Sequence, residues 1–179
     1  MRTSAGFEGR EEQIADLFTQ TFTAAEGPEE GALVGSLARD LLARTPPDEI
    51  RVFTAMDDGR LIAVAVFTRL TFPEDPRHVV LLSPMAVATD RQRQGIGQAL
   101  IAGALQSLRA EGAEVAITYG DPDYYRRVGF VPVSPDQATP PFPLSFPHGW
   151  IAQSLTSDEM PALSGKPTCV AALDRTDIW

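Results

Sequence analysis

Near the middle of the chain, a polar turn with two glycines joins an apolar, β-rich stretch to a helical pattern. The apolar stretch covers residues 78–88, and the turn covers 89–97 and contains Gly95 and Gly97. After it, apolar residues recur every three or four positions until Gly112, which predicts an amphipathic helix. Glycines at such a turn let a ligand approach the backbone closely, and the first helical turn adds unpaired N–H groups and the positive end of the helix dipole. The segment is therefore predicted to be a strand–turn–helix unit that holds phosphate.

The spacing of the glycines excludes two of the known phosphate-binding turns. A P-loop requires a lysine and a hydroxyl residue directly after its second glycine, and this turn has neither. The dinucleotide-binding turn requires a third glycine, where Leu100 stands in this chain. What remains is the pattern Gln92-x-x-Gly95-x-Gly97 directly before a helix.

The other segments predict helices first and strands later. Apolar residues at helical spacing predict two amphipathic helices, over residues 10–25 and 29–44. Asp57-Asp58-Gly59 lies between two β-rich runs and predicts a hairpin. The remaining predicted elements are strands 51–56, 60–68, 78–88 and 115–119, a short helix from Asp121 to Gly129, and late strands 150–155 and 168–173. This order predicts a single α/β or α+β domain, residues 1–179, built around a mixed sheet.

Two of the predicted strands have unusual composition. Residues 61–67 form a continuous apolar run, which predicts a strand that is covered on both faces. This run is far shorter than the ~20 residues that a membrane-spanning helix needs. Ser83-Pro84 interrupts strand 78–88, and a proline within a strand predicts a bulge or a local break in pairing.

The charge balance limits the kinds of partner. The chain has 15 Lys and Arg residues against 24 Asp and Glu residues, a formal net charge of −9. Because such a field repels nucleic acid and anionic lipid, we expect neither as a partner. The two histidines have no partner at metal-ligand spacing, so no metal is expected. Residues 1–10 lack the apolar segment of a signal peptide, and the single Cys169 has no cysteine to pair with, which together favour a cytoplasmic location.

A second motif, Gly120-Asp-Pro-Asp-Tyr-Tyr125-Arg-Arg-Val-Gly129-Phe130, follows strand 115–119. Together with Gln92-x-x-Gly95-x-Gly97, it resembles the GNAT N-acetyltransferase superfamily, and in particular a bacterial branch with the pattern Gly-Asp-Pro-x-Tyr-Tyr-x-Arg-x-Gly-Phe. The resemblance covers nearly the whole chain. It implies a GNAT-type fold, with a mixed, mostly antiparallel central sheet flanked by helices and a bulged strand before the cofactor loop.

The resemblance implies acetyl-CoA as co-substrate. In this family, main-chain N–H groups of the turn hold the CoA pyrophosphate, and the preceding strand end pairs with the pantetheine arm. A backbone N–H in that strand would donate to the thioester oxygen, and a donor aimed at a developing oxyanion can be worth ~3–4 kcal/mol. The residues implied to bind the cofactor are Met85, Ala86, Val87, Gln92, Arg93, Gln94, Gly95, Ile96, Gly97 and Gln98.

By the same resemblance, Tyr125 is the implied general acid for the departing CoA thiolate. A phenol with an ordinary pKa near ~10 is protonated at neutral pH and can donate its proton. The competing interpretation is that its ring only packs the short helix against the sheet. The general base stays open, because strand 115–119 has no carboxylate where many family members carry a Glu. Asp121, Glu30 and a water chain are candidates, although an Asp before a proline is more often a helix cap.

The motifs leave two functions of different classes open, and transfer of an acyl group longer than acetyl is a third option that depends on the cavity beyond Val87. The first is an N-acetyltransferase that moves an acetyl group from acetyl-CoA to a primary amine of a small molecule or peptide by direct attack. The second is a non-catalytic acyl-CoA-binding sensor or partner module. The proline-rich segment 131–150 is expected to line the acceptor site, because loops commonly carry specificity. The protein is expected to act as a monomer or homodimer.

Overall fold

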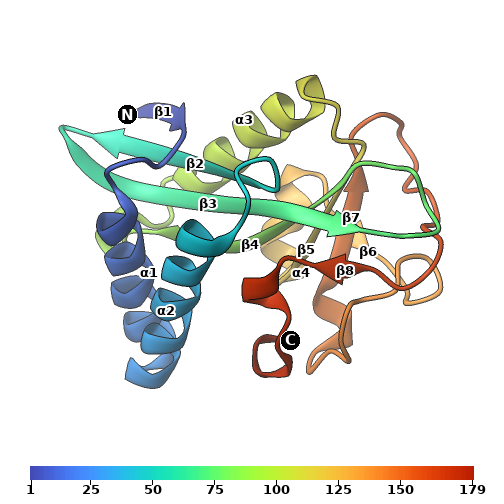
Figure 1. Cartoon of the computed structure of the whole chain (residues 1–179). Helices are drawn as coiled ribbons and strands as arrows, with labels where there is room; N and C mark the ends of the chain where they lie inside the picture. The colour runs from blue at the N-terminus through green and yellow to red at the C-terminus, as the bar shows by residue number, and fades with distance from the viewer. The chain divides into compact units, whose positions relative to one another are not determined.

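The computed structural model describes all residues from 1 to 179 (Figure 1). The strands are β1 (Arg2–Ala5), β2 (Ile50–Asp57), β3 (Arg60–Thr71), β4 (Val79–Val87), β5 (Val115–Tyr119), β6 (Val131–Pro132), β7 (Trp150–Ser154) and β8 (Thr168–Cys169). The helices are α1 (Glu11–Glu26), α2 (Pro28–Arg44), α3 (Ile96–Ala110) and α4 (Pro122–Tyr125). Short 3₁₀ turns are η1 (Thr89–Arg91), η2 (Arg126–Val128), η3 (Pro147–Gly149), η4 (Ala171–Leu173) and η5 (Thr176–Ile178).

The chain divides into two compact units. Unit 1 comprises Met1–Phe67 and Pro84–Ile101, and unit 2 comprises Thr68–Ser83 and Ala102–Trp179. Three elements, β3, β4 and α3, begin in one unit and end in the other. The chain therefore passes between the units inside regular elements rather than through linkers.

Unit 1 contains the strand order β1-β2-β3-β4 and the helices α1 and α2, which pack against each other (Figure 1). The hairpin between β2 and β3 turns at Asp58 and Gly59, whose φ angles are 47° and 79°. Two consecutive left-handed residues form the type of turn that matches the twist of paired strands. The hairpin predicted from the sequence is thus present, for the expected reason.

The central part of β3 is the apolar centre of unit 1. Each side chain from Leu61 to Phe67 is at most 8% exposed. Burial on both faces explains why the run does not alternate between apolar and polar residues. From α1, the side chains of Ile14, Leu17 and Phe18 are buried, as the helical spacing predicts.

Unit 2 contains the strand order β4-β5-β7-β6, and β8 pairs with the end of β3. The β4–β5 pair is parallel, whereas β5–β7, β6–β7 and β3–β8 are antiparallel. The β4–β5 ladder ends at the pair Leu82 and Thr118, although β4 continues to Val87. Pairing therefore stops directly before Ser83-Pro84, where the proline has no N–H to donate. The sheet is mixed and mostly antiparallel, as expected.

The structure differs from the predictions at three places: β1, β6 and the segment after Cys169. The late strand predicted over residues 168–173 is wrong beyond Cys169, because the chain turns into η4. The strands β1 and β6 were not predicted. All four residues of β1 are exposed, so no apolar alternation could reveal this strand. None of the helices has both the length and the hydropathy needed to cross a membrane.

Candidate functional site

The predicted phosphate-binding turn lies in unit 1, between β4 and α3. After η1, Arg93 and Gly95 adopt left-handed backbone conformations, with φ angles of 61° and 76°. A non-glycine residue rarely adopts this conformation, and such strain tends to occur at functional sites. Residues 92–95 are exposed, and the helix begins at Ile96.

The start of α3 presents unpaired backbone donors. Its first helical hydrogen bond runs from the Ala99 N–H to the Gly95 carbonyl oxygen, at 3.0 Å. The N–H groups of Ile96, Gly97 and Gln98 therefore precede the helical ladder, where the positive end of the helix dipole adds to them. A Cβ atom placed on Gly95 would meet no atom within 4 Å. The turn thus combines free donors with open space, as an anion site requires.

Ion pairs fasten η1 to the β2–β3 hairpin. The Arg60 guanidinium donates to both carboxylate oxygens of Asp90, at 2.7 and 2.8 Å. On the other strand of the hairpin, Asp57 pairs with Arg91 at 2.8 Å. The hydrogen bond from Arg60 lowers the pKa of Asp90 below its usual value, so the carboxylate is charged at neutral pH. The sequence analysis did not predict these pairs.

Gln92 ties the turn back to the end of β4. Its side-chain amide Nε2 donates to the Val87 carbonyl oxygen at 3.1 Å. The Ala88 N–H donates to Ile62 of β3 at 2.8 Å. Because backbone groups of successive strand residues point in opposite directions, the N–H groups of Val87 and Met85 point away from β3. Both donors therefore lie on the edge of β4 that faces away from β3.

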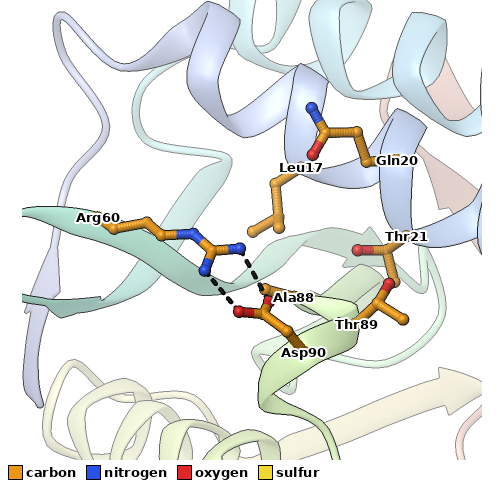
Figure 2. Close-up of a pocket in the computed structure, with 7 residues that line it drawn as sticks. All are labelled: Leu17, Gln20, Thr21, Arg60, Ala88, Thr89 and Asp90. Atoms are coloured by element: carbon orange, nitrogen blue, oxygen red, sulfur yellow. Dashed lines mark hydrogen bonds and ion pairs between the residues drawn. The ribbon is translucent and has the colours of Figure 1, made fainter.

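A pocket of about 360 Å³ lies beside η1 (Figure 2). Its lining comes from α1, from β3 and from the segment after β4: Leu17, Gln20, Thr21, Arg60, Ala88, Thr89 and Asp90. The Arg60–Asp90 pair forms part of its wall (Figure 2). The Thr21 hydroxyl is buried and has no hydrogen-bond partner. Because the lining residues are distant in sequence, no local motif could reveal this pocket.

The second predicted segment, Gly120 to Phe130, lies in unit 2. The Asp121 carboxylate accepts a hydrogen bond from the Asp123 N–H at 2.9 Å and caps α4, whose first residue is Pro122. This confirms the capping interpretation of Asp121. A Cβ on Gly120 would lie only 2.8 Å from Cε2 of Tyr125, so the glycine lets the tyrosine ring lie directly on the chain after β5.

The Tyr125 ring is held by other aromatic rings. It meets Tyr124 edge-on at a centroid distance of 5.0 Å and Phe130 at 5.7 Å. Burial, with a smaller contribution from Tyr124, raises the pKa of Tyr125 well above its usual value. The phenol therefore keeps its proton throughout the neutral pH range.

The end of this segment is fixed by a close approach to β7. Gly129 has a left-handed φ of 97°, and its Cβ position lies 2.9 Å from Oε1 of Gln153. The Gln153 amide also donates to the Val128 carbonyl at 2.8 Å. The left-handed backbone of Gly129 thus favours glycine at this position of the Tyr-x-x-x-Gly-Phe pattern, and the Gln153 amide lies directly against it.

The structure leaves the general base open. No residue of β5 carries a carboxylate, Asp121 is exposed and engaged as a cap, and Glu30 lies half-buried on α2.

No group of three or more His, Cys, Asp and Glu side chains is arranged to hold a metal. The predicted cofactor residues all lie in the segment Pro84–Ile101 of unit 1, and Tyr125 lies in unit 2.

Comparison with known proteins gives matches over most of the chain. The model of the acetyltransferase (GNAT) family matches residues 11–130. An uncharacterized N-acetyltransferase of Escherichia coli strain K12, YjhQ, is 34% identical over 161 residues, which cover 87% of this chain and 84% of that protein.

Two solved structures have the same fold. The GNAT N-acetyltransferase YhbS of Escherichia coli, in complex with CoA, superimposes with a TM-score of 0.80 at 22% identity and covers 98% of this chain and 93% of that one. A GNAT acetyltransferase of Brucella melitensis, in complex with acetyl-CoA, gives a TM-score of 0.70 at 22% identity, with 97% and 99% of the two chains covered.

Proposed function

Because this chain belongs to the GNAT acetyltransferase family, we propose that it transfers the acetyl group of acetyl-CoA to a primary amine by direct attack. The observation that carries the proposal is the turn before α3. Its left-handed Arg93 and Gly95 and the unpaired N–H groups of Ile96 to Gln98 suit a pyrophosphate. The two solved structures of the same fold that contain CoA or acetyl-CoA support this cofactor.

In this proposal, unit 1 supplies the cofactor site. The pyrophosphate is held by backbone N–H groups of the turn, while Gln92 keeps the turn close to β4. The pantetheine arm pairs with the free edge of Met85, Ala86 and Val87. The Met85 or Val87 N–H, both of which point away from β3, donates to the thioester oxygen as negative charge develops there.

The proposed chemistry needs no side-chain nucleophile. The neutral amine attacks the thioester carbonyl carbon, a C–N bond forms, and the amine nitrogen loses a proton to a base or to water. The tetrahedral intermediate then collapses, the C–S bond breaks, and the thiolate takes the proton of Tyr125. The tyrosinate regains a proton from solvent, so the products are the acetylated amine and CoA. The raised pKa of Tyr125 ensures that the proton is present before the thiolate forms.

We further propose that both units act as one acyltransferase domain, because β3, β4 and α3 each run through both. The acceptor is a small-molecule or peptide amine, and segment 131–150 contributes to its site. This segment is anchored beside the tyrosine motif, since the Phe146 N–H donates to the Tyr119 hydroxyl at 2.7 Å. The Phe146 ring itself is 65% exposed, as a contact for an incoming substrate needs to be. The cytoplasm, as a reducing compartment that contains acetyl-CoA, is the proposed location.

A non-catalytic acyl-CoA-binding module is the competing proposal. It is favoured by the lack of a carboxylate in β5, the strand where many family members carry their base. Both proposals require the turn before α3, so cofactor binding alone does not distinguish them. Only the enzyme needs the Tyr125 hydroxyl.

Two measurements test the proposal. Acetyl-CoA should raise the melting temperature of the protein and NAD should not, because only a ligand that binds the native state stabilises it. Thioester consumption is then measured with a panel of primary amines. Amine-dependent release of CoA supports the enzyme, whereas binding without release supports the sensor. The absence of any stabilisation by acetyl-CoA contradicts both.

A further inference from the structure

Residues 142–148 form a segment that has no core of its own. None of its residues is buried, and none belongs to a strand. Only its last two residues, in η3, have regular structure. Because few buried contacts stabilise such a segment, its order depends on the neighbouring parts of unit 2 that hold it.

Tyr119, the last residue of β5, provides one of these contacts. Its phenol oxygen accepts a hydrogen bond from the Phe146 N–H at 2.7 Å. The chain returns to the sheet directly after the segment, where the Gly120 N–H donates to the Gly149 carbonyl oxygen at 3.0 Å. A Cβ on Gly149 would lie 3.2 Å from Cε2 of Tyr119, so the glycine lets the chain pass close to the tyrosine ring.

Trp179 contacts both the Tyr119 ring and the segment. Its indole stacks on the Tyr119 ring, with the centroids 6.4 Å apart and an angle of 16° between the planes. The indole itself is fixed, because its Nε1 donates to the Leu173 carbonyl oxygen at 3.0 Å in a buried contact. The Ser145 hydroxyl donates to the main-chain oxygen of Trp179 at 2.7 Å, and the Phe142 ring lies 6.1 Å from the indole. Tyr119 and Trp179 together therefore hold the segment at three points.

The side chain that this arrangement presents is Phe146. It is 65% exposed, and its ring meets that of His148 edge-on at 6.1 Å. The residue after Tyr119 is Gly120, whose Cβ position lies 2.8 Å from the Tyr125 ring. Two successive residues at the end of β5 thus contact the proposed acid and the proposed acceptor-side segment.

We propose that Tyr119 is a positioning residue for the acceptor amine, and that its hydroxyl, by holding the Phe146 N–H, places the exposed Phe146 ring where the amine binds. Trp179 keeps the Tyr119 ring in place for this bond. A phenyl ring offers the substrate an apolar or cation–π contact. This inference rests on the proposed acetyl transfer to an amine. The competing explanation is that Tyr119 and Trp179 only stabilise the fold.

The first test observes the hydrogen bond without requiring turnover, by NMR measurement of the solvent exchange of the Phe146 amide hydrogen. Tyr119→Phe keeps the ring beside Trp179 but removes the hydroxyl, so we expect this exchange to become about 3–10-fold faster. Ser157→Ala is the control, because it removes another exposed hydrogen bond of unit 2, from the Ser157 hydroxyl to the Glu159 carbonyl oxygen at 2.8 Å. It should leave the exchange unchanged. An unchanged rate in Tyr119→Phe overturns the proposal.

The second test is a double-mutant cycle on acetyl transfer to an amine that the wild-type protein accepts. Tyr119→Phe should raise the KM for this amine about 3–10-fold, the usual worth of one hydrogen bond, without changing kcat or the affinity for acetyl-CoA. Phe146→Ala, which changes an exposed side chain, should also raise this KM. In the Phe146→Ala background, Tyr119→Phe should have no further effect, because a residue that acts through the Phe146 ring loses its role when the ring is absent.

The cycle separates this inference from the function on which it rests. If Tyr119→Phe lowers the melting temperature and leaves the KM for the amine unchanged, its role is structural and the positioning role is overturned. Equal increases in KM in both backgrounds also overturn it, and in both cases the proposed acetyl transfer stands. If the wild-type protein acetylates no amine of the panel, the proposed transfer is wrong and the positioning role is wrong with it.

Discussion

The turn before α3 and the segment around Tyr125 are both glycine-containing connections that follow a strand, but different forces hold them. Polar contacts fix the turn: the exposed Arg60–Asp90 pair, the half-buried Asp57–Arg91 pair and the Gln92 amide. Packed aromatic rings, of which Phe130 is buried, and two close glycine approaches, at Gly120 and Gly129, fix the tyrosine segment.

The difference matches what each region is proposed to do. The turn is proposed to bind the cofactor through backbone donors, so most of its side chains can change without removing a donor, provided that no Cβ atom fills the open space. The proposed role of the tyrosine segment depends on one oxygen atom of one side chain, so any shift of the packing around that side chain should affect the chemistry. Mutations should therefore separate binding from turnover, region by region.

The largest effect is expected at Tyr125. Phenylalanine retains the ring and its contact with Phe130 but removes the transferable proton. We expect kcat to fall by ~10²–10⁴, the usual contribution of a positioned acid, with little change in acetyl-CoA affinity. Steady-state acetyl transfer and a thermal melt are measured on the same preparation. Unchanged turnover would show that water supplies the proton.

Gly120→Ala tests whether the packing of Gly120 against the Tyr125 ring controls the turnover rate. The new methyl group overlaps the Tyr125 ring, since the Cβ position lies 2.8 Å from Cε2. A displacement of about 1 Å can lower a rate by ~10²-fold, so we expect a fall in kcat of this order without loss of cofactor affinity. Gly103→Ala on α3 is the control, because its Cβ meets no atom within 4 Å. If Gly120→Ala is as active as the control, the ring position is unimportant.

Gly95→Val tests cofactor binding by the turn, whereas the two preceding variants test turnover. The valine side chain fills the open space beside the donors, so acetyl-CoA affinity should fall about 10–100-fold, as when one or two charge-assisted hydrogen bonds are lost. Gly112→Val is the control, because Gly112 is also left-handed, at 97°, with no atom within 4 Å of its Cβ position. Both variants should lose similar stability from backbone strain, and only the first should lose binding. Normal binding by folded Gly95→Val contradicts the pyrophosphate assignment.

The smallest effect is expected for the exposed Arg60–Asp90 pair. Arg60→Ala should lower the melting temperature slightly at low ionic strength, and added salt should reduce the difference. Because the pKa of Asp90 is lowered in the folded protein, the pair contributes fully at pH values above the ordinary Asp pKa, near ~4. The contribution is lost as the pH falls through the lowered pKa. Melts of both proteins from pH 7 to pH 3 check this, and a difference that grows on acidification contradicts it.

The main elements and both motifs were predictable from the sequence. The helical stripes of α1, α2 and α3 and the Asp57-Asp58-Gly59 hairpin are local patterns, so each segment of sequence contains its own signal. The glycine turn could be located for the same reason. The capping role of Asp121 was also readable, because a cap and the N–H groups that it accepts are neighbours in the chain.

Tertiary structure decided the features that connect distant residues. The edge strand β1 is exposed along its whole length, so its sequence has no burial pattern. Arg60 and Asp90 are 30 positions apart, and Thr118 and Leu82 are 36 apart, so only the paired strands bring them together. The left-handed backbone of Arg93 was likewise unreadable, since arginine has no preference for this conformation. Local sequence determined which segments carry the candidate chemistry, and long-range pairing decided which neighbours hold those groups in place.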